Sequence, residues 1–403
     1  MTRALRSRGA RFGGAALVAL LASGIGAGVA SAQERWRESY FPYFTGGPTD
    51  GLMVIARYQL TKGAPYFISQ SDEEDVINPL SYAGALSGEA GIGTRGSRFV
   101  SVILRAPGLV PGWRFHGTLE GRRDGRFGFY GLGPADVAPA DPQLDVGTFN
   151  RARRDRYVAR AEVTRTLAGP LRLAVAGSIE HTKFSEIAAP SQIGATPITN
   201  TDGILRASLV VDTRDAEFVT GNGVLLEAGV LAGTDGVDTS VQDDAPRAMY
   251  EGAYLHLRGY VSPREGTVLA GRFAMRGLSR GAALSARYMM PGWERDITVL
   301  GGVESHRGYI EGRFGGRGVL LGGLEIRHDL LNAGDFGAIS VLGFVDGGRV
   351  FEFEESVKLT ASEWELGYGG GVALRILRSA VLTFNFAGGG DGFAFSTGTG
   401  WTF

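Results

Sequence analysis

Few residues in this 403-residue chain could perform catalysis. Cysteine is absent, which excludes thiol nucleophiles and cysteine metal ligands. The pattern "GIGTRG" at Gly91–Gly96 fits a dinucleotide-binding loop, but it lies between two alternating segments instead of opening a helix. The histidines have no metal-binding spacing; they are His116, His181, His256, His306 and His328. We therefore expect no catalytic residue, no cofactor and no metal, with a serine and a histidine assembled only by the fold as the alternative.

A polar, glycine-rich stretch, "SHRGYIEGRFGG" at Ser305–Gly316, is the strongest candidate for a functional site. It is too polar for a buried strand and too rich in glycine for a helix, so it predicts an ordered loop with close backbone approaches. Arg307 and Tyr309 lie within it. Taken alone, Arg307 would more often be a solvated charge in a mobile loop, so its interpretation depends on the surrounding elements.

The N-terminal residues have the features of a secretory signal peptide. Four arginines precede a run of small and apolar residues at Gly13–Ala30, and "ASAQ" supplies the small residues that a signal peptidase requires. We expect cleavage after Ala32, with a retained membrane anchor as the alternative. No later segment has the ~20 consecutive apolar residues of a spanning helix, so the mature chain is predicted to be soluble or a β-barrel. With 41 basic and 42 acidic residues spread along the chain, nothing indicates nucleic-acid binding.

Apolar and polar residues alternate in segments of about a dozen residues. In one of them, Leu171, Leu173 and Val175 share one face, while Arg172 and Glu180 lie on the other. Strands of soluble sandwiches are usually ~5 to 6 residues long. Transmembrane strands need ~9 to 11 residues and tolerate charged side chains that face a wet lumen. The pattern therefore predicts an all-β fold, a transmembrane antiparallel β-barrel.

Fifteen such segments can be counted, from 51–60 to 393–403. Because single-chain bacterial barrels close with an even number of strands, we expect a sixteenth within Glu34–Thr45 or Lys62–Leu80. Four long polar loops, the first being "SQSDEEDVINP" at Ser69–Pro79, alternate in chain order with tight turns. We expect the long loops outside the cell and the turns in the periplasm.

The last segment carries an aromatic pattern. "FAFSTGTGWTF" puts Phe393, Phe395, Trp401 and Phe403 on one predicted face of a final strand. Trp401 and Phe403 in this position resemble the signal by which the assembly machinery recognises outer-membrane proteins. We expect that machinery as a partner during biogenesis, outer-membrane lipids as the surroundings, and the bacterial outer membrane as the location.

Five motifs in a fixed order carry a family resemblance. They are "DTRDAEFVTGNG" at Asp212–Gly223, "GGVESHRGY" at Gly301–Tyr309, "GGLEIRHDL" at Gly322–Leu330, "FVDGGRVF" at Phe344–Phe351 and the closing aromatic strand. Together they resemble the barrel domain of the bacterial surface antigen family, the superfamily of BamA, TamA and the two-partner secretion transporters. The resemblance covers nearly the whole mature chain and implies a barrel of sixteen strands.

The resemblance also implies roles for particular residues. A long extracellular loop before the twelfth strand would fold into the lumen and present Arg307, followed by Gly308 and Tyr309. The expected partners of Arg307 are the lumenal acids Asp346 and Glu325. This fits the chemistry, because a guanidinium offers a planar fork to carboxylates in a lumen that is more screened from water than the surface.

Three more residues belong to the same motifs. His306 stands where the family has an aliphatic residue, so the packing of the loop tip is expected to differ from the family's. Asp212 and Arg214 occupy a strand-end motif, for which an ordinary ion pair is the alternative.

Two functions are compatible with these features. Assembly factors of the family carry periplasmic POTRA modules, for which this sequence leaves no room: we expect a signal peptide at 1–32, a short periplasmic segment at 33–49 and the barrel at 50–403. The barrel could assist polypeptide or lipid insertion or translocation, helped by a separate periplasmic partner, through a weak seam between its first and last strands. The alternative is a plugged small-solute channel or structural protein without insertase activity. We expect no enzyme, with a phospholipase-type barrel as the enzymatic alternative, and no general insertase activity by the barrel alone.

Overall fold

The computed structural model describes residues 36–63, 82–132, 149–187, 198–235, 249–293, 295–334, 337–352, 363–376 and 380–403. The predicted signal peptide at 1–32, with its cleavage site, lies outside this part of the chain. Residues Trp36–Phe403 form one compact unit. No helix in the described part is long and apolar enough to cross a membrane.

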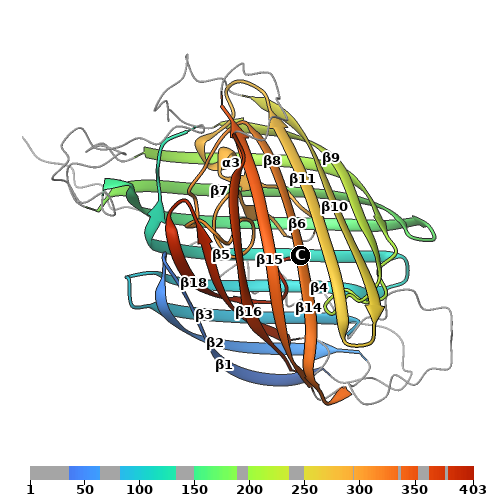
Figure 1. Cartoon of the computed structure of the whole chain (residues 1–403). Helices are drawn as coiled ribbons and strands as arrows, with labels where there is room; N and C mark the ends of the chain where they lie inside the picture. Colours follow the sequence, from blue (N-terminus) through green and yellow to red (C-terminus); the bar gives the residue numbers. More distant parts are fainter. Residues whose placement is uncertain are drawn as a thin grey trace, which may run out of the picture. The chain divides into compact units, whose positions relative to one another are not determined.

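Sixteen strands form one antiparallel sheet in chain order, and the sheet curls into a nearly closed barrel (Figure 1). The strands are β1 (Arg37–Gly47), β2 (Gly51–Lys62), β3 (Gly84–Gly93), β4 (Arg98–Val110), β5 (Trp113–Gly128), β6 (Arg151–Ala168), β7 (Leu171–Glu186), β8 (Ile198–Asp212), β9 (Gly223–Asp235), β10 (Tyr250–Arg264), β11 (Thr267–Leu278), β14 (Gly318–Asn332), β15 (Gly337–Phe351), β16 (Glu365–Ile376), β17 (Ala380–Gly389) and β18 (Gly392–Thr399). The predicted fold class and strand number are confirmed.

The first strand corrects the predicted domain boundaries. Residues 33–49 were expected to be periplasmic, yet β1 pairs with β2 along its whole length, from Arg37 opposite Thr61 to Gly47 opposite Gly51. β1 is the sixteenth strand that was expected within Glu34–Thr45 or Lys62–Leu80, although its Pro42 would normally argue against a strand. An edge strand tolerates proline, since its missing N–H need not enter a ladder.

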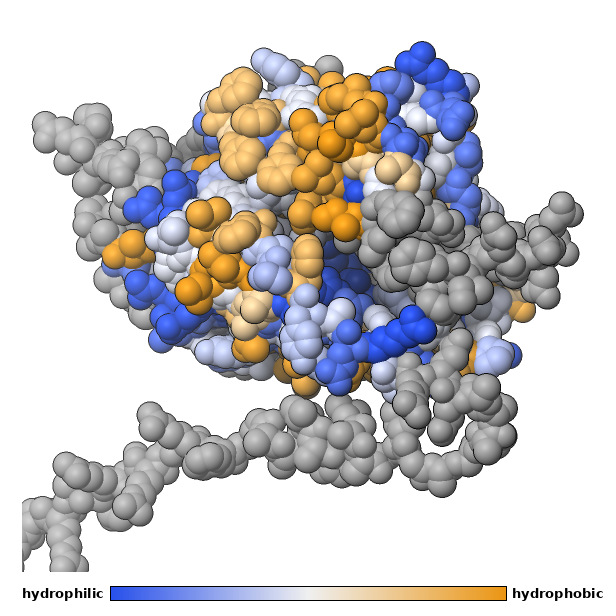
Figure 2. Space-filling view, turned by 90° about the horizontal axis from the view of Figure 1, so that it is seen from below, coloured by the Kyte–Doolittle hydropathy of each residue, from blue (hydrophilic) through white to orange (hydrophobic). Residues whose placement is uncertain are grey.

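The two faces of the sheet differ as the alternation predicts. Outward side chains are apolar and exposed, such as Val100, Ile179 and Leu205. Inward side chains include buried arginines and acids, such as Arg206 and Glu227. Figure 2 shows hydrophobic side chains gathered on the outer surface beside a hollowed region of hydrophilic ones. This is the arrangement of a barrel with lipid outside and a polar lumen.

The connections divide into two ends of the barrel. At the turn end lie the tight connections 111–112, 169–170 and 265–266, together with 63–83. At the loop end lie the longer connections, which are 129–150, 187–197, 236–249, 279–317 and 352–364. The polar segment 69–79, which was predicted at the loop end, lies outside the described residues. The strands on either side of it, β2 and β3, are joined at the turn end, because consecutive antiparallel strands switch ends at every connection.

Candidate functional site

The longest connection, residues 279–317, fills the lumen, and we call it the lumenal insert. It contains the short helix α3 (Leu284–Arg287) and a two-residue hairpin formed by β12 (Met289–Met290) and β13 (Ile297–Thr298). Its apolar residues form buried clusters with inward side chains of the barrel. The predicted folding of this loop into the lumen is what the structure shows.

Arg307 is clamped between two carboxylates. Its Nε donates to Asp346 Oδ2 at 2.8 Å, its Nη2 donates to Asp346 Oδ1 at 3.0 Å, and its backbone N–H donates to Asp346 Oδ2 at 3.1 Å. Nη1 donates to Glu325 Oε2, so the fork uses both partners that the resemblance implies. The guanidinium carbon lies 3.4 Å from the ring centroid of Phe344. Arg307 is 2% exposed, which makes the clamp a buried ionic contact.

Two more arginines share these acids. Arg272 Nη2 lies 3.3 Å from Asp346 Oδ1 and its Nη1 donates at 2.8 Å to the backbone oxygen of Glu304. Arg327 Nε donates to Glu325 Oε1 at 2.7 Å. Arg272 and Arg327 come from β11 and β14, so the barrel wall itself orients both acids toward the insert.

The aromatic residues after β18 cap this cluster, which corrects their predicted position. Trp401 and Phe403 were expected beside the exposed Phe393 and Phe395, but β18 ends at Thr399. Gly400 adopts a positive φ of 94°, a conformation that favours glycine, and turns the chain inward. Phe403 is buried with its ring 4.7 Å from the Arg272 guanidinium, and Trp401 lies 4.2 Å from that of Arg327. An assembly signal acts on the unfolded chain, so that role stays a prediction.

The tip of the insert rests on a strip of glycines. A Cβ at Gly308 would lie 2.7 Å from the Cα of Gly367 on β16 and 2.8 Å from the oxygen of Gly388 on β17. Tyr309 donates to Glu365 Oε2 at 2.6 Å. His306, in the position that departs from the family, is buried edge-on against Tyr309, with Nε2 at 2.9 Å from the oxygen of Glu365. Burial lowers the pKa of His306, which favours a neutral ring here.

The glycine strip leads to a first prediction. Gly367→Ala places a methyl group 2.8 Å from the Cα of Gly308, closer than real Cβ contacts allow, so the tip must lift away from β16. We expect faster proteolysis within the insert and a lower temperature of barrel unfolding. Gly259→Ala on β10 is the matched control, because its Cβ would meet nothing within 4 Å. Equal behaviour of the two variants would contradict the close contact.

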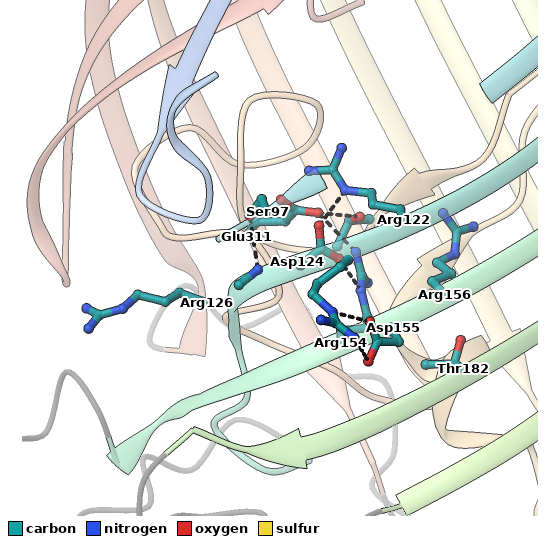
Figure 3. A network of polar contacts seen from close by, with 12 residues as sticks. Ser97, Arg122, Asp124, Arg126, Arg154, Asp155, Arg156, Thr182 and Glu311 are labelled. Atoms are coloured by element: carbon teal, nitrogen blue, oxygen red, sulfur yellow. Dashed lines mark hydrogen bonds and ion pairs between the residues drawn. The ribbon is translucent and has the colours of Figure 1, made fainter. Parts of the chain in front are cut away.

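A second anchor joins the insert to β5 and β6 (Figure 3). Asp124 is fully buried and accepts hydrogen bonds from Arg122 and, at 2.7 Å, from Arg154 Nε. Glu311 of the insert lies 3.5 Å from Arg154 Nη2, and its backbone oxygen accepts from the N–H of Gly128 at 3.2 Å. Charged side chains of β5 and β6 therefore bind the insert to the barrel wall at this point.

A third anchor, which sequence reasoning missed, lies at the hairpin between β12 and β13. Asp296 pairs with Arg206 of β8 and lies 3.7 Å from Arg160 of β6. Trp293 donates its backbone N–H to Glu227 at 2.7 Å and its indole N–H to Thr164 at 3.1 Å. The local signal was a tryptophan among charged residues in "PGWERD", which has no periodicity to reveal its partners.

The strand-end motif forms an ion-pair group at the turn end. Arg214 Nε and Nη2 donate to Asp212 at 2.9 and 3.1 Å, and Arg172 donates to Asp212 at 2.9 Å. Glu217 in the same connection accepts a two-pronged hydrogen bond from Arg114, at 2.5 and 3.0 Å. Arg114 and Arg172 also flank the ring of Trp293, so this group supports the third anchor.

One hydrolase-like pattern escaped the sequence reading. Residues Gly277–Gly281 read Gly-x-Ser-x-Gly, a pattern of serine hydrolases. Ser279 lies directly after β11, where its Oγ accepts from the N–H of Glu251 at 2.9 Å and its own N–H donates to Glu251 oxygen at 2.8 Å. In this chain the pattern therefore extends the pairing of β11 with β10 by one residue. Within the described residues, no group of three histidines or acids is placed to hold a metal.

The fold and the site together define a sixteen-stranded antiparallel barrel whose lumen holds an insert pinned by buried ion pairs. A sequence-family model described as the Omp85 superfamily domain matches residues 84–401. The chain belongs to the Omp85 superfamily, as the motifs indicated. Its barrel homologues are outer-membrane proteins, which supports the predicted location.

Solved structures share the fold at low sequence identity. BamA from Haemophilus ducreyi lacking POTRA domains 1–3 is 14% identical with a TM-score of 0.53, covering 91% of this chain and 71% of that one. CdiB from Escherichia coli is 11% identical with a TM-score of 0.56, covering 92% and 64%. CdiB from Acinetobacter baumannii is 13% identical with a TM-score of 0.50, covering 91% and 60%, so this chain spans less than two thirds of either CdiB. No curated protein matches the sequence.

Proposed function

We propose that this outer-membrane barrel assists the insertion or translocation of polypeptide or lipid through the seam between β1 and β18, with a separate periplasmic partner. Neighbouring strands elsewhere in the sheet are joined by hydrogen-bonded ladders, whereas β1 and β18 lie in contact without a ladder among the described residues. The contacts there include Thr397 Oγ1, which lies 2.5 Å from the N–H of Gly46 and 3.3 Å from its oxygen. This weak seam is the observation that carries the proposal, because unpaired edges can accept another strand.

A pocket beside the seam supports the same function. It has a volume of about 460 Å³, and β1, the β17–β18 turn, β18 and the insert tip contribute to its walls. The lining includes Gly46 and Gly47 of β1, Gly392 and Phe393 of β18, and Tyr309 of the insert. The seam, the pocket and the pinned tip therefore meet at one place, where movement of the insert would change the width of the opening.

A reversible crosslink tests the seam. The chain has no cysteine, so Gly46→Cys with Thr397→Cys introduces a single disulfide across β1 and β18. We expect oxidation to block insertion or translocation activity in proteoliposomes supplied with a periplasmic extract, and reduction to restore it. Asn385→Cys with Ser396→Cys is the matched control, because these residues are already opposite each other in the β17–β18 ladder. Full activity of the oxidised seam variant would rule out a seam-dependent function.

The three anchors favour a second candidate, a plugged channel or structural protein. Each anchor pairs an ionic group of the insert with the barrel wall, which opposes the passage of solutes. We also propose that the chain is not an enzyme, because Asp296 and Arg307 of the insert are paired with charged residues of the barrel wall. Large conductance only after the anchors are removed, without insertion activity, would favour the channel.

A further inference from the structure

A charged row crosses the lipid-facing surface at the loop end. Successive cross-strand partners are Arg98 on β4, Arg123 on β5, Asp155 on β6 and Lys183 on β7. They share their outward parity with exposed apolar residues further down the same strands, including Val100 and Ile179. Arg153, which is exposed, lies two residues beyond Asp155 on the same face. These five residues are called the outer basic row.

The row is limited to four strands. The next residues in register are Ile92 on β3, opposite Arg98, and Thr199 on β8, opposite Lys183; neither is charged. Four basic residues face one acid, so the row carries a net positive charge of three. An even spread of basic residues around the barrel end would not concentrate this positive charge on four strands.

The charge of the row is only partly compensated within the protein. Arg123 Nε and Nη2 donate to Asp155 at 2.5 and 3.1 Å, which occupies the acid. Within the described residues, no ion pair is made by Arg98, Arg153 or Lys183. Arg98 stands directly opposite Arg123, and like charges at opposed positions destabilise a sheet. An anion bound over the row would remove this repulsion.

The row lies at the height of a lipid headgroup. Tyr157, two residues below Asp155, is exposed and lies beside His181 of β7, with ring centroids 6.3 Å apart. Tyrosine is enriched at membrane interfaces, where its ring meets the apolar boundary and its hydroxyl meets the headgroups. Below Tyr157 the outward residues of β6 are Ala159, Ala161 and Val163, an apolar band. Long loops mark the extracellular end of such barrels, so the row faces the outer leaflet.

We propose that the outer basic row binds the phosphate groups of outer-leaflet lipids. Arg98, Arg153 and Lys183 supply positive charge that no described residue pairs, and the Arg123–Asp155 pair holds the middle of the row in place. Because the row lies on β4 to β7, away from the β1–β18 seam, a bound lipid would fix that wall of the barrel in the membrane while leaving the seam free.

Lipid retention tests the proposal in the full chain refolded into phosphatidylcholine nanodiscs. The discs contain lipid A with both phosphates, or the same lipid after enzymatic removal of both, and native mass spectrometry counts the lipid A that stays bound. We expect about a hundredfold greater retention of the phosphorylated form, because Arg98, Arg153 and Lys183 each add about fivefold near an anionic headgroup. The preference should decline as salt is added, because salt screens these charges. Arg98→Gln with Arg153→Gln and Lys183→Gln should abolish this preference.

Two controls fix the interpretation. Arg165→Gln removes an exposed outward arginine near the opposite end of β6 and should leave retention unchanged. Inorganic phosphate at the concentration of the lipid should not displace it, whereas displacement would show a simple phosphate site and overturn the lipid assignment. Equal retention of the two lipids by the wild-type chain, a result that needs no variant to fold, would also overturn it. The lipid assignment would also be overturned if the triple variant folds and retains as much phosphorylated lipid A as the wild-type chain.

Discussion

Arg307→Ala is expected to release the tip of the lumenal insert and to reduce barrel stability by about 3 to 5 kcal/mol, the usual cost of breaking a buried ion pair. The reason is that Asp346 and Glu325, each almost fully buried, lose the guanidinium that holds the insert to both. Urea unfolding of the purified barrel, followed by tryptophan fluorescence, measures the change. Conductance in planar bilayers should rise in the same variant, because the plug becomes mobile.

Three variants separate the clamp from charge alone. Arg307→Lys keeps the charge but loses the fork, so we expect an intermediate loss. Arg307→Ala combined with Asp346→Asn should recover part of the stability, because it removes a buried carboxylate that would keep only the longer contact with Arg272. Arg295→Ala is the control, since Arg295 and its partner Glu304 are both exposed. If Arg307→Ala unfolds like the Arg295 variant, the clamp does not hold the insert.

The second large effect is expected at Asp296, in the hairpin of the insert. Burial alone would raise the pKa of this carboxyl, but Arg206 and Arg160 outweigh burial and lower the pKa from 3.8 to about 2. A carboxyl whose pKa is depressed in the folded state stabilises that state above its ordinary pKa and loses the effect as pH falls through the lowered value. The docked hairpin should therefore be fully stable above about pH 4 and weaken toward pH 2.

Asp296→Asn should remove that contribution, about 2 kcal/mol, and its pH dependence. Hydrogen exchange of residues 289–299 reports the docking, and exchange in the variant should be faster near neutral pH. Glu304→Gln, which removes an exposed acid of the same insert, is the matched control. Slow exchange at neutral pH in Asp296→Asn, equal to that of the control, would show that Trp293 and the backbone contacts hold the hairpin by themselves.

Alternation along the sequence determined the fold class. A two-residue period shows which side chains of a strand share a face. Long alternating segments such as 171–180 therefore required lipid on one side of the sheet and a polar lumen on the other. The motif around Arg307 likewise indicated Asp346 and Glu325, because the order of five motifs carried the family pattern. These features depend on residues close together in the chain or on a pattern of motifs, so they can be read without coordinates.

Only the tertiary structure decided where strands stop and which distant charges meet. The sequence left the sixteenth strand open between Glu34–Thr45 and Lys62–Leu80, because Pro42 of β1 is tolerated only in a strand that is known to be an edge. Gly400 turned Trp401 and Phe403 into the lumen, although strict alternation had placed them with Phe393 on the lipid face. Asp296 of the insert pairs with Arg206 of β8 and Arg160 of β6. Each outcome depends on contacts between residues far apart in the sequence, and periodicity specifies the direction of a side chain without specifying what lies opposite it.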